Sequence, residues 1–101
     1  MKDEIMNGFV DIVSSQLNVN PNDIFKKDKR KNIVNARHIL YYLSKKRNIS
    51  IVEIENFMNE NAYKIEHSSI IYGIGKVARR YQSDRDYRFI LKKIMRQCST
   101  I

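Results

Sequence analysis

An all-helical fold, a compact bundle of about five helices, is what this sequence predicts. Apolar residues recur three or four positions apart along most of the chain, which is the spacing of one helical face. Only three glycines and one proline are present, too few for the many tight turns of a β-sandwich. With 101 residues, 43% of them apolar, the chain is long enough for a single domain over 1–101 with its own core.

The N-terminal helix is expected from apolar residues spaced by four, namely Ile5, Phe9, Val13 and Leu17. This pattern stops at 18–22, where Asn-Val-Asn-Pro-Asn has the composition of a turn. Residues 23–25 then have the composition for a single helical turn, with Asn22 as its cap.

Two helices are expected in the middle of the chain. The first begins near Ile33 and ends in Lys45-Lys46-Arg47, where cations complement the negative end of the helix dipole. The second begins with Ser50 and Glu53, which have the spacing of a capping box. Its apolar residues are Ile51, Ile54, Phe57 and Met58.

Two further helices complete the predicted bundle. The first starts at His67 and runs through an apolar stripe that ends near Tyr81. It contains Gly73 and Gly75, each of which costs about 1 kcal/mol in a helix, so we expect packing to hold it and a neighbouring helix to approach closely there. Residues 83–86 are expected to cap the C-terminal helix of 83–101, whose expected buried face is Tyr87, Ile90/Leu91, Ile94 and Cys98.

The positive charge is concentrated in two segments. The net charge is +8, and residues 26–47 hold nine Lys or Arg against one acid, Asp28. Residues 76–96 hold eight Lys or Arg against two acids. The first segment opens with a basic loop, residues 26–31, whose like charges repel unless a partner relieves them. Such clusters favour a polyanionic partner, because neutralising phosphates releases condensed counterions.

The helix from Ser50, the link after it and the helix from His67 have the layout of a helix-turn-helix. The second helix of this motif enters the major groove with its first turn, which here is Glu66-His67-Ser68-Ser69. These side chains are short and carry hydrogen-bonding groups for base edges. The basic loop would then contact phosphates, which position a protein on DNA without reading its sequence.

The chain resembles one protein family in four motifs, which occur in this order: Asp23-Ile24-Phe25 before a basic loop, Arg37-His38-Ile39-Leu40-Tyr41-Tyr42-Leu43, Ser50-Ile51-Val52-Glu53-Ile54, and His67-Ser68-Ser69-Ile70-Ile71. Over residues 10–82 the chain resembles the C-terminal DNA-binding domain, domain IV, of the bacterial replication initiator DnaA. The resemblance implies a Trp-repressor-like helical bundle with a helix-turn-helix. It also implies binding to short A/T-rich boxes of the kind found at replication origins.

The resemblance implies a role for each matching residue. The expected base readers are Arg37, Glu66, His67, Ser68 and Ser69. The residues expected at the DNA backbone or minor groove are Lys26, Lys27, Lys29, Arg30 and Lys31. The sequence departs from the family pattern in a longer link before His67, in Ser for Thr at 68 and 69, and in the acid Asp28 within the loop.

No enzymatic function is expected. His67 and Ser68 are neighbours on a helix, so their side chains do not face each other as a nucleophile and its base would. The run Gly73-Ile74-Gly75-Lys76 lacks the earlier glycine of a phosphate-binding loop, and Val77 stands where Ser or Thr would bind magnesium. Two His and one Cys lie far apart, and no apolar run is long enough to span a membrane. We therefore expect no metal, cofactor, nucleotide or membrane partner.

We thus predict a non-enzymatic protein that binds double-stranded DNA in replication initiation or its regulation, in the cytoplasm and associated with the nucleoid. The alternative is a protein-interaction module, or a decoy, that acts on a host replication initiator or regulator and binds DNA weakly. A membrane-surface protein is a third interpretation, which the lack of an aromatic-rich apolar face disfavours.

Overall fold

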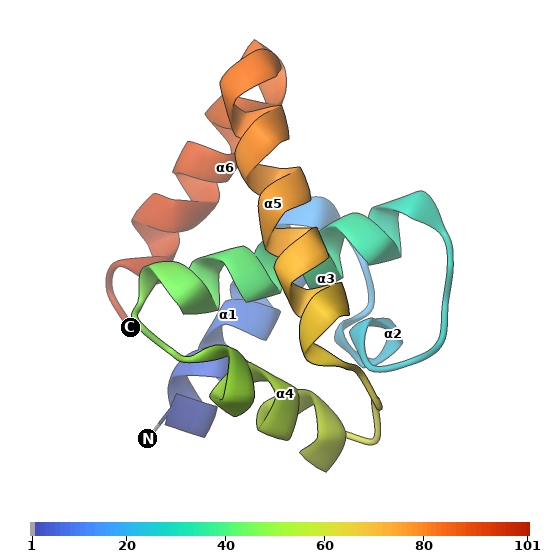
Figure 1. The fold of residues 1–101 in the computed structure, drawn as a ribbon. Helices are drawn as coiled ribbons and strands as arrows, with labels where there is room; N and C mark the ends of the chain where they lie inside the picture. Colours follow the sequence, from blue (N-terminus) through green and yellow to red (C-terminus); the bar gives the residue numbers. More distant parts are fainter. Residues whose placement is uncertain (1) are drawn as a thin grey trace.

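Six helices and no strand make up residues 2–101, the part of the chain that the computed structural model describes (Figure 1). They are α1 (Lys2–Leu17), α2 (Pro21–Ile24), α3 (Lys31–Lys46), α4 (Ile51–Glu60), α5 (His67–Ser83) and α6 (Arg85–Cys98). The all-helical class is confirmed. Five of the helices are those predicted from periodicity, and the sixth, α2, is the single turn expected before the basic loop.

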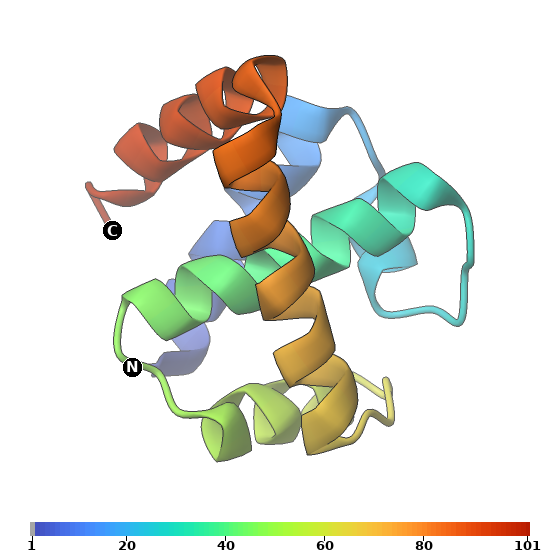
Figure 2. The same ribbon diagram turned by 45° about the horizontal axis from the view of Figure 1, so that its top comes forward.

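Helix α3 is the centre of the bundle. It packs against α1 on one side and α5 on the other, and α5 crosses over it in both views (Figures 1 and 2). Helix α4 lies under the first half of α5, and α6 returns along α5 and α1. The radius of gyration is 12.3 Å, close to the ~13 Å of a compact chain of this length.

The core takes residues from every helix, and of the pair Ile90/Leu91 expected on the buried face of α6, Leu91 is buried whereas Ile90 is 44% exposed. Its largest fully buried side chains include Phe9 of α1, Tyr41 of α3 and Phe57 of α4. Tyr42 is buried as well, so the assignment of the Tyr41-Tyr42 pair to the core is confirmed. Ile70 of α5 has no exposed surface and fixes the first turns of that helix against α3 and α4.

The predicted helix caps are confirmed in two places and wrong in one. Ser50 and Glu53 form both hydrogen bonds of the capping box, and Asp84 caps α6 by accepting from the Tyr87 N–H. At α2 the cap is Asn20 and not Asn22, since the Asn20 side chain accepts the Asn22 N–H at 2.9 Å. The physical reason is Pro21, whose fixed φ and missing N–H suit the first helical position and so move the cap back.

The two glycines of α5 differ in what surrounds them. A Cβ on Gly73 would lie 2.6 Å from the His38 ring and 3.2 Å from the Tyr41 ring, so the close approach of α3 and α5 is confirmed there. A Cβ on Gly75 would meet only the guanidinium of Arg79, on the same helix. The expectation of a close neighbouring helix is therefore wrong at Gly75.

Candidate nucleic-acid interface

Helices α4 and α5 form a helix-turn-helix joined by residues 61–66. The chain leaves α4 through Ala62, which has a φ of 65° and turns the backbone sharply. Glu66 stands at the N-cap position of α5 in an extended conformation, and its side chain makes no capping hydrogen bond. The exposed Glu66 carboxylate is therefore not used to hold the helix, and the first turn of α5 faces solvent.

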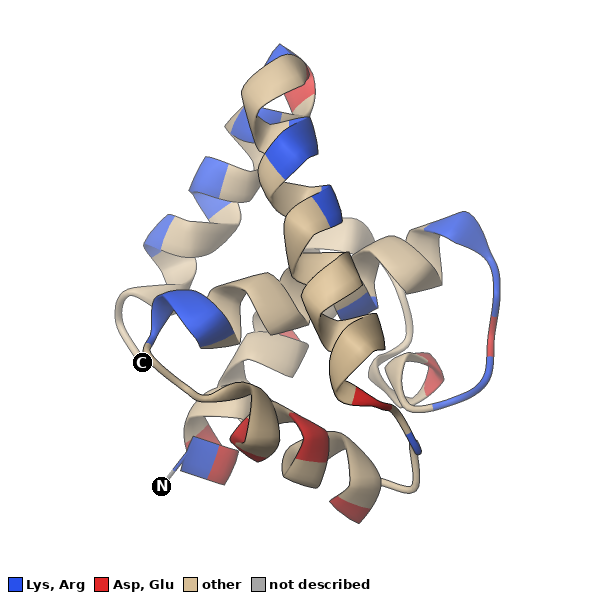
Figure 3. Cartoon of the chain, in the orientation of Figure 1, with Lys and Arg blue, Asp and Glu red and all other residues tan. Residues whose placement is uncertain are grey.

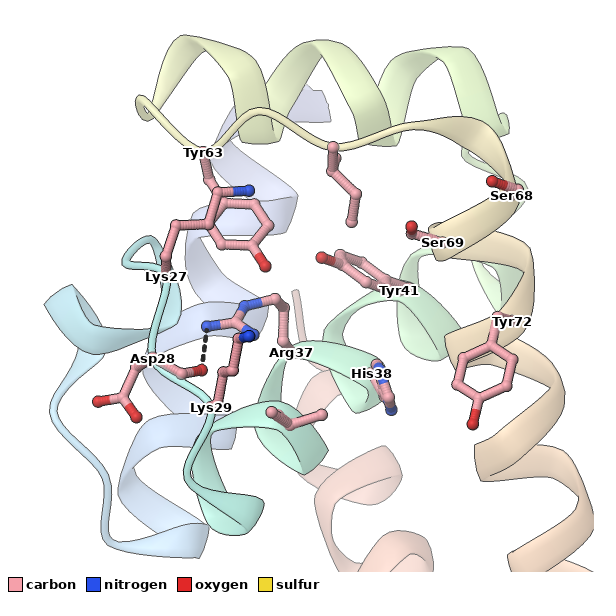
Figure 4. A pocket seen from close by; sticks show the side chains of 12 residues that line it. Lys27, Asp28, Lys29, Arg37, His38, Tyr41, Tyr63, Ser68, Ser69 and Tyr72 are labelled. Atoms are coloured by element: carbon pink, nitrogen blue, oxygen red, sulfur yellow. Dashed lines mark hydrogen bonds between the residues drawn. The ribbon is translucent and has the colours of Figure 1, made fainter.

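The four residues of this first turn, Glu66 to Ser69, are all exposed, as a reading surface requires. His67 is engaged within the protein, because its Nε2 lies 2.9 Å from Oε1 of Glu55 on α4. Ser68 and Ser69 lie at the edge of a groove and point toward it (Figure 4). The next residue, Ile70, is buried and anchors the turn.

Arg37 is the main departure from the expected geometry. Its side chain is only 5% exposed. Its Nε donates to the Ile24 carbonyl at 2.8 Å, and its Nη2 donates to the carbonyls of Lys26 at 2.7 Å and Asp28 at 3.4 Å. The guanidinium also stacks 4.5 Å from the centre of the Tyr63 ring. Arg37 thus organises the basic loop from below, and those atoms are not available to a base.

Acidic side chains within and beside the basic loop neutralise part of its charge. Asp28 accepts hydrogen bonds from the Arg30 guanidinium, the shortest at 2.6 Å, and this contact lowers the pKa of the Asp28 carboxyl to about 2. Asp23 of α2 lies 3.1 Å from Arg30 and 3.4 Å from Lys26. The repulsion expected among the loop cations is therefore relieved partly inside the protein.

The remaining lysines of the loop differ in their surroundings. Lys27 turns toward the link before α5, where its Nζ donates to the Lys64 carbonyl at 2.6 Å and lies 4.0 Å from the centre of the Tyr63 ring. Lys29 and Lys31 are exposed. Lys29 lines the groove on the loop side, across from Ser68 and Ser69 of α5 (Figure 4).

A groove of about 500 Å³ separates the basic loop from the first turn of α5. The loop forms one wall and Ser68, Ser69 and Tyr72 the other, while Tyr63 of the link lies at one end (Figure 4). Ile65 of the link also lines the groove. Its floor is α3, with Arg37, His38 and Tyr41.

Two side chains on the floor of the groove have perturbed ionisation. Burial raises the pKa of Tyr41, whose buried hydroxyl has no hydrogen-bond partner among the described residues. Burial and the nearby Lys76 and Arg37 lower the pKa of His38. Both effects keep these groups neutral at pH 7, so the positive charge around the groove comes from its lysines and Arg37.

The charges are distributed unevenly between elements (Figure 3). Helix α4 carries Glu53, Glu55 and Glu60 and no basic residue, whereas α5 carries Lys76, Arg79 and Arg80 and no acidic one. The recognition turn thus lies between an acidic helix and a basic loop.

Sequence reasoning missed Tyr63 as the residue that joins the loop to the link, between the cations of Lys27 and Arg37. The sequence does offer one indication, which is that Tyr63 lies in the longer link, where an aromatic ring is stabilised by packing against another part of the protein. Sequence reasoning also missed Glu55, whose spacing from His67 carries no periodic pattern.

Other kinds of site find no support in the described chain. Within residues 2–101, no three His, Cys, Asp or Glu side chains are grouped so that they could hold a metal ion. Burial raises the pKa of the Cys98 thiol to about 11, so this thiol stays protonated and unreactive. None of the described helices is both long and apolar enough to cross a membrane.

A small helical bundle with an exposed recognition turn, and with a basic loop beside it, defines a helix-turn-helix protein. The family model described as "Bacterial dnaA protein helix-turn-helix" matches residues 7–77. This chain belongs to that family, and the resemblance expected from its sequence motifs is confirmed. The matched helix-turn-helix domain is a non-catalytic, DNA-binding domain, in line with the prediction that this domain is not an enzyme.

Relatives of this chain are chromosomal replication initiator proteins DnaA. The chain is 30% identical over 92 residues to the protein of Campylobacter concisus, an alignment that covers 90% of this chain and 20% of that protein. It is 29% identical over 86 residues to that of Aliarcobacter butzleri, covering 84% of this chain and 19% of the relative. With the protein of Campylobacter curvus it shares 33% identity over 73 residues, which cover 71% and 16% respectively. The chain therefore spans about a fifth of the length of these relatives.

Proposed function

We propose that this domain binds double-stranded DNA in replication initiation or its regulation, with the first turn of α5 in the major groove. The observation that carries this proposal is the groove of about 500 Å³ between that turn and the basic loop. A DNA strand lying over the groove would expose its major-groove edge to α5 and its phosphates to the loop. Family membership and the DnaA relatives support the same function.

The first turn of α5 has the chemistry for direct readout. The Ser68 and Ser69 hydroxyls donate or accept hydrogen bonds, and the Glu66 carboxylate accepts from a cytosine amine. His67 would exchange its contact with Glu55 for a base or phosphate. Arg37 would act on DNA mainly by shaping the loop, since its Nε and Nη2 bind loop and α2 carbonyls.

The basic loop would contact phosphates or enter the adjacent minor groove. Lys29 and Lys31 are exposed and suited to this. Lys26 and Arg30 would exchange Asp23 and Asp28 for phosphates. Lys27, whose Nζ donates to the Lys64 carbonyl of the link, would add to the positive potential of the loop. A narrow A/T-rich minor groove attracts inserted cations, so an A/T-rich box, of the kind expected from the family resemblance, fits this loop.

Selection of bound duplexes from a random-sequence pool tests the proposal. We expect a short preferred box, with affinity that falls steeply as salt rises. A protein that binds no duplex even at low salt would contradict DNA binding altogether. Equal binding to all duplexes would support only the sequence-independent contacts with phosphates and would contradict readout of a box.

Alanine variants should separate the two kinds of contact. Lys29→Ala is expected to weaken binding to all duplexes and to reduce the salt dependence, because one phosphate contact is lost. Ser69→Ala and His67→Ala are expected to reduce discrimination between the selected box and a scrambled duplex by about 1–3 kcal/mol each. Binding titrations over a salt series measure both quantities. Lys45→Ala, at the other end of α3 from the loop, is the control, and equal effects of all variants on both duplexes would contradict these roles.

Glu55→Gln is expected to strengthen DNA binding about two- to fivefold at low salt. The change removes a negative charge beside the reading turn and weakens the hold on His67, and exposed contacts of this kind are worth about 0.2–1 kcal/mol. Binding titrations check it. Glu60→Gln, which removes the same charge from the same helix away from His67, serves as the control. Unchanged or weaker binding by Glu55→Gln would show that His67 needs Glu55 to be positioned.

A protein-interaction module acting on a replication protein of its host is the second candidate function. It is favoured by Phe89 and Ile90, which are exposed on α6 outside the groove. This alternative would be supported if the domain bound a replication protein and did not shift a DNA duplex in a gel at low salt.

A further inference from the structure

The second turn of α5 presents large apolar side chains to solvent. Ile71 is 57% exposed and Tyr72 is 56% exposed. The apolar residues of α5 that pack into the core are on another face of the helix, with Ile70 and Val77 almost fully buried. The packing of this domain therefore gives no reason for an isoleucine at position 71.

Helix geometry places Ile71 on the reading face. It follows His67 by four residues and Ser68 by three, and side chains at these spacings lie one above another on a helix. At a rise of ~1.5 Å per residue, Ile71 lies about 5 Å further along the axis, or roughly one to two base pairs beyond the first turn. A helix that enters the major groove with Ser68 would bring Ile71 against base edges as well.

Gly75 follows Ile71 by four residues and therefore lies on the same face of α5. It costs about 1 kcal/mol relative to alanine within a helix, and no neighbouring helix requires it, since a Cβ there would meet only Arg79. A residue without a side chain on an otherwise open face lets a ligand approach the helix backbone closely.

The charges on α5 indicate which ligand covers this face. The helix carries Lys76, Arg79 and Arg80 and no acid, and although Asp84 just after its end lies 3.5 Å from Arg80, its net positive charge attracts a polyanion. DNA combines such a backbone with an apolar group in its major groove, the C5-methyl of thymine, which aliphatic side chains contact. An exposed isoleucine between the hydroxyls of the first turn and the cations of the third and fourth turns matches this combination.

We propose that Ile71 contacts a thymine methyl group in the major groove, so that base readout extends from the first turn of α5 into its second. Gly75 then lies where the DNA comes nearest to the helix backbone. This inference rests on the proposed DNA-binding function, and it adds a specificity-determining residue to the ten DNA-contacting residues that the family resemblance implies.

The test uses the best duplex recovered from the random pool, with its thymines replaced one at a time by uracil, which lacks only the methyl group. We expect one replacement to weaken binding of the unchanged protein about fourfold, the value for one buried methyl-sized group. Ile71→Ala is expected to bind the thymine duplex more weakly and to show no difference between thymine and uracil at that position. Ile90→Ala, the same change at an exposed site on α6, should keep the full difference.

Gly75→Ala gives a separate readout. We expect this variant to unfold at a higher temperature and yet to bind the selected duplex more weakly, because the added methyl group stands where the DNA approaches. If every uracil duplex binds as well as its thymine parent, or if Ile71→Ala retains the difference, the inference is overturned while DNA binding stands. A pool with no preferred duplex would instead contradict the sequence-specific readout on which the inference rests.

Discussion

Arg37→Ala is expected to lower the free energy of unfolding by about 2–4 kcal/mol. The change removes a buried guanidinium that donates to the carbonyls of Ile24 and Lys26, and each of these acceptors would lose its charged partner. It also removes the cation stacked on Tyr63. Urea unfolding followed by circular dichroism measures the loss.

Arg37→Lys is the informative companion, because it keeps the charge and loses the planar fork that reaches several carbonyls at once. We expect it to recover only part of the stability. If both variants unfold at the urea concentration of the unchanged protein, the hydrogen bonds to the loop contribute nothing net. A variant that stays folded but binds all duplexes weakly would support a role for Arg37 in shaping the loop.

Gly73→Ala is expected to lower the free energy of unfolding by up to about 2 kcal/mol, although alanine is the better helix former. The new methyl group would lie 2.6 Å from the His38 ring, and such overpacking costs about 1–3 kcal/mol against a propensity gain of about 1. Either α5 moves away from α3 or the His38 and Tyr41 rings leave their positions. Thermal or urea unfolding measures the change.

The matched control is Gly75→Ala on the same helix. It gains the same helix propensity and meets only the flexible end of Arg79, so it should stabilise the domain by about 0.5–1 kcal/mol. The two alanine variants are thus expected to have opposite signs. If both variants stabilise the domain equally, α3 and α5 can move apart at Gly73 at little cost in free energy.

The helices were predictable because their signals are local. Spacing of apolar residues places α1, α3, α5 and α6, and the Ser50–Glu53 pair marks the start of α4 within four residues of sequence. The misplaced cap at Asn22 has a local cause too, since two asparagines flank Pro21 and only the proline geometry decides between them.

The site was less predictable because its contacts are distant in sequence and often made by the backbone. The carbonyls that hold Arg37 belong to residues 9–13 positions away and leave no trace in composition. Tyr63 meets Lys27 across 36 residues, and Glu55 meets His67 across a turn whose shape depends on Ala62. The motifs could indicate which residues contact DNA but not the contacts that hold those residues in place. The assignment of the ten residues to DNA is still a prediction.

The bracing of the basic loop against the link before α5 has a consequence for the length of the DNA site. Lys27 and Arg37 hold Tyr63 between them, and Lys27 also binds the Lys64 carbonyl. The distance between the two segments proposed to contact DNA is thus set before DNA arrives. Such a domain measures a fixed interval along the duplex, and one inserted base pair between the two contact regions would force either the protein or the DNA to deform.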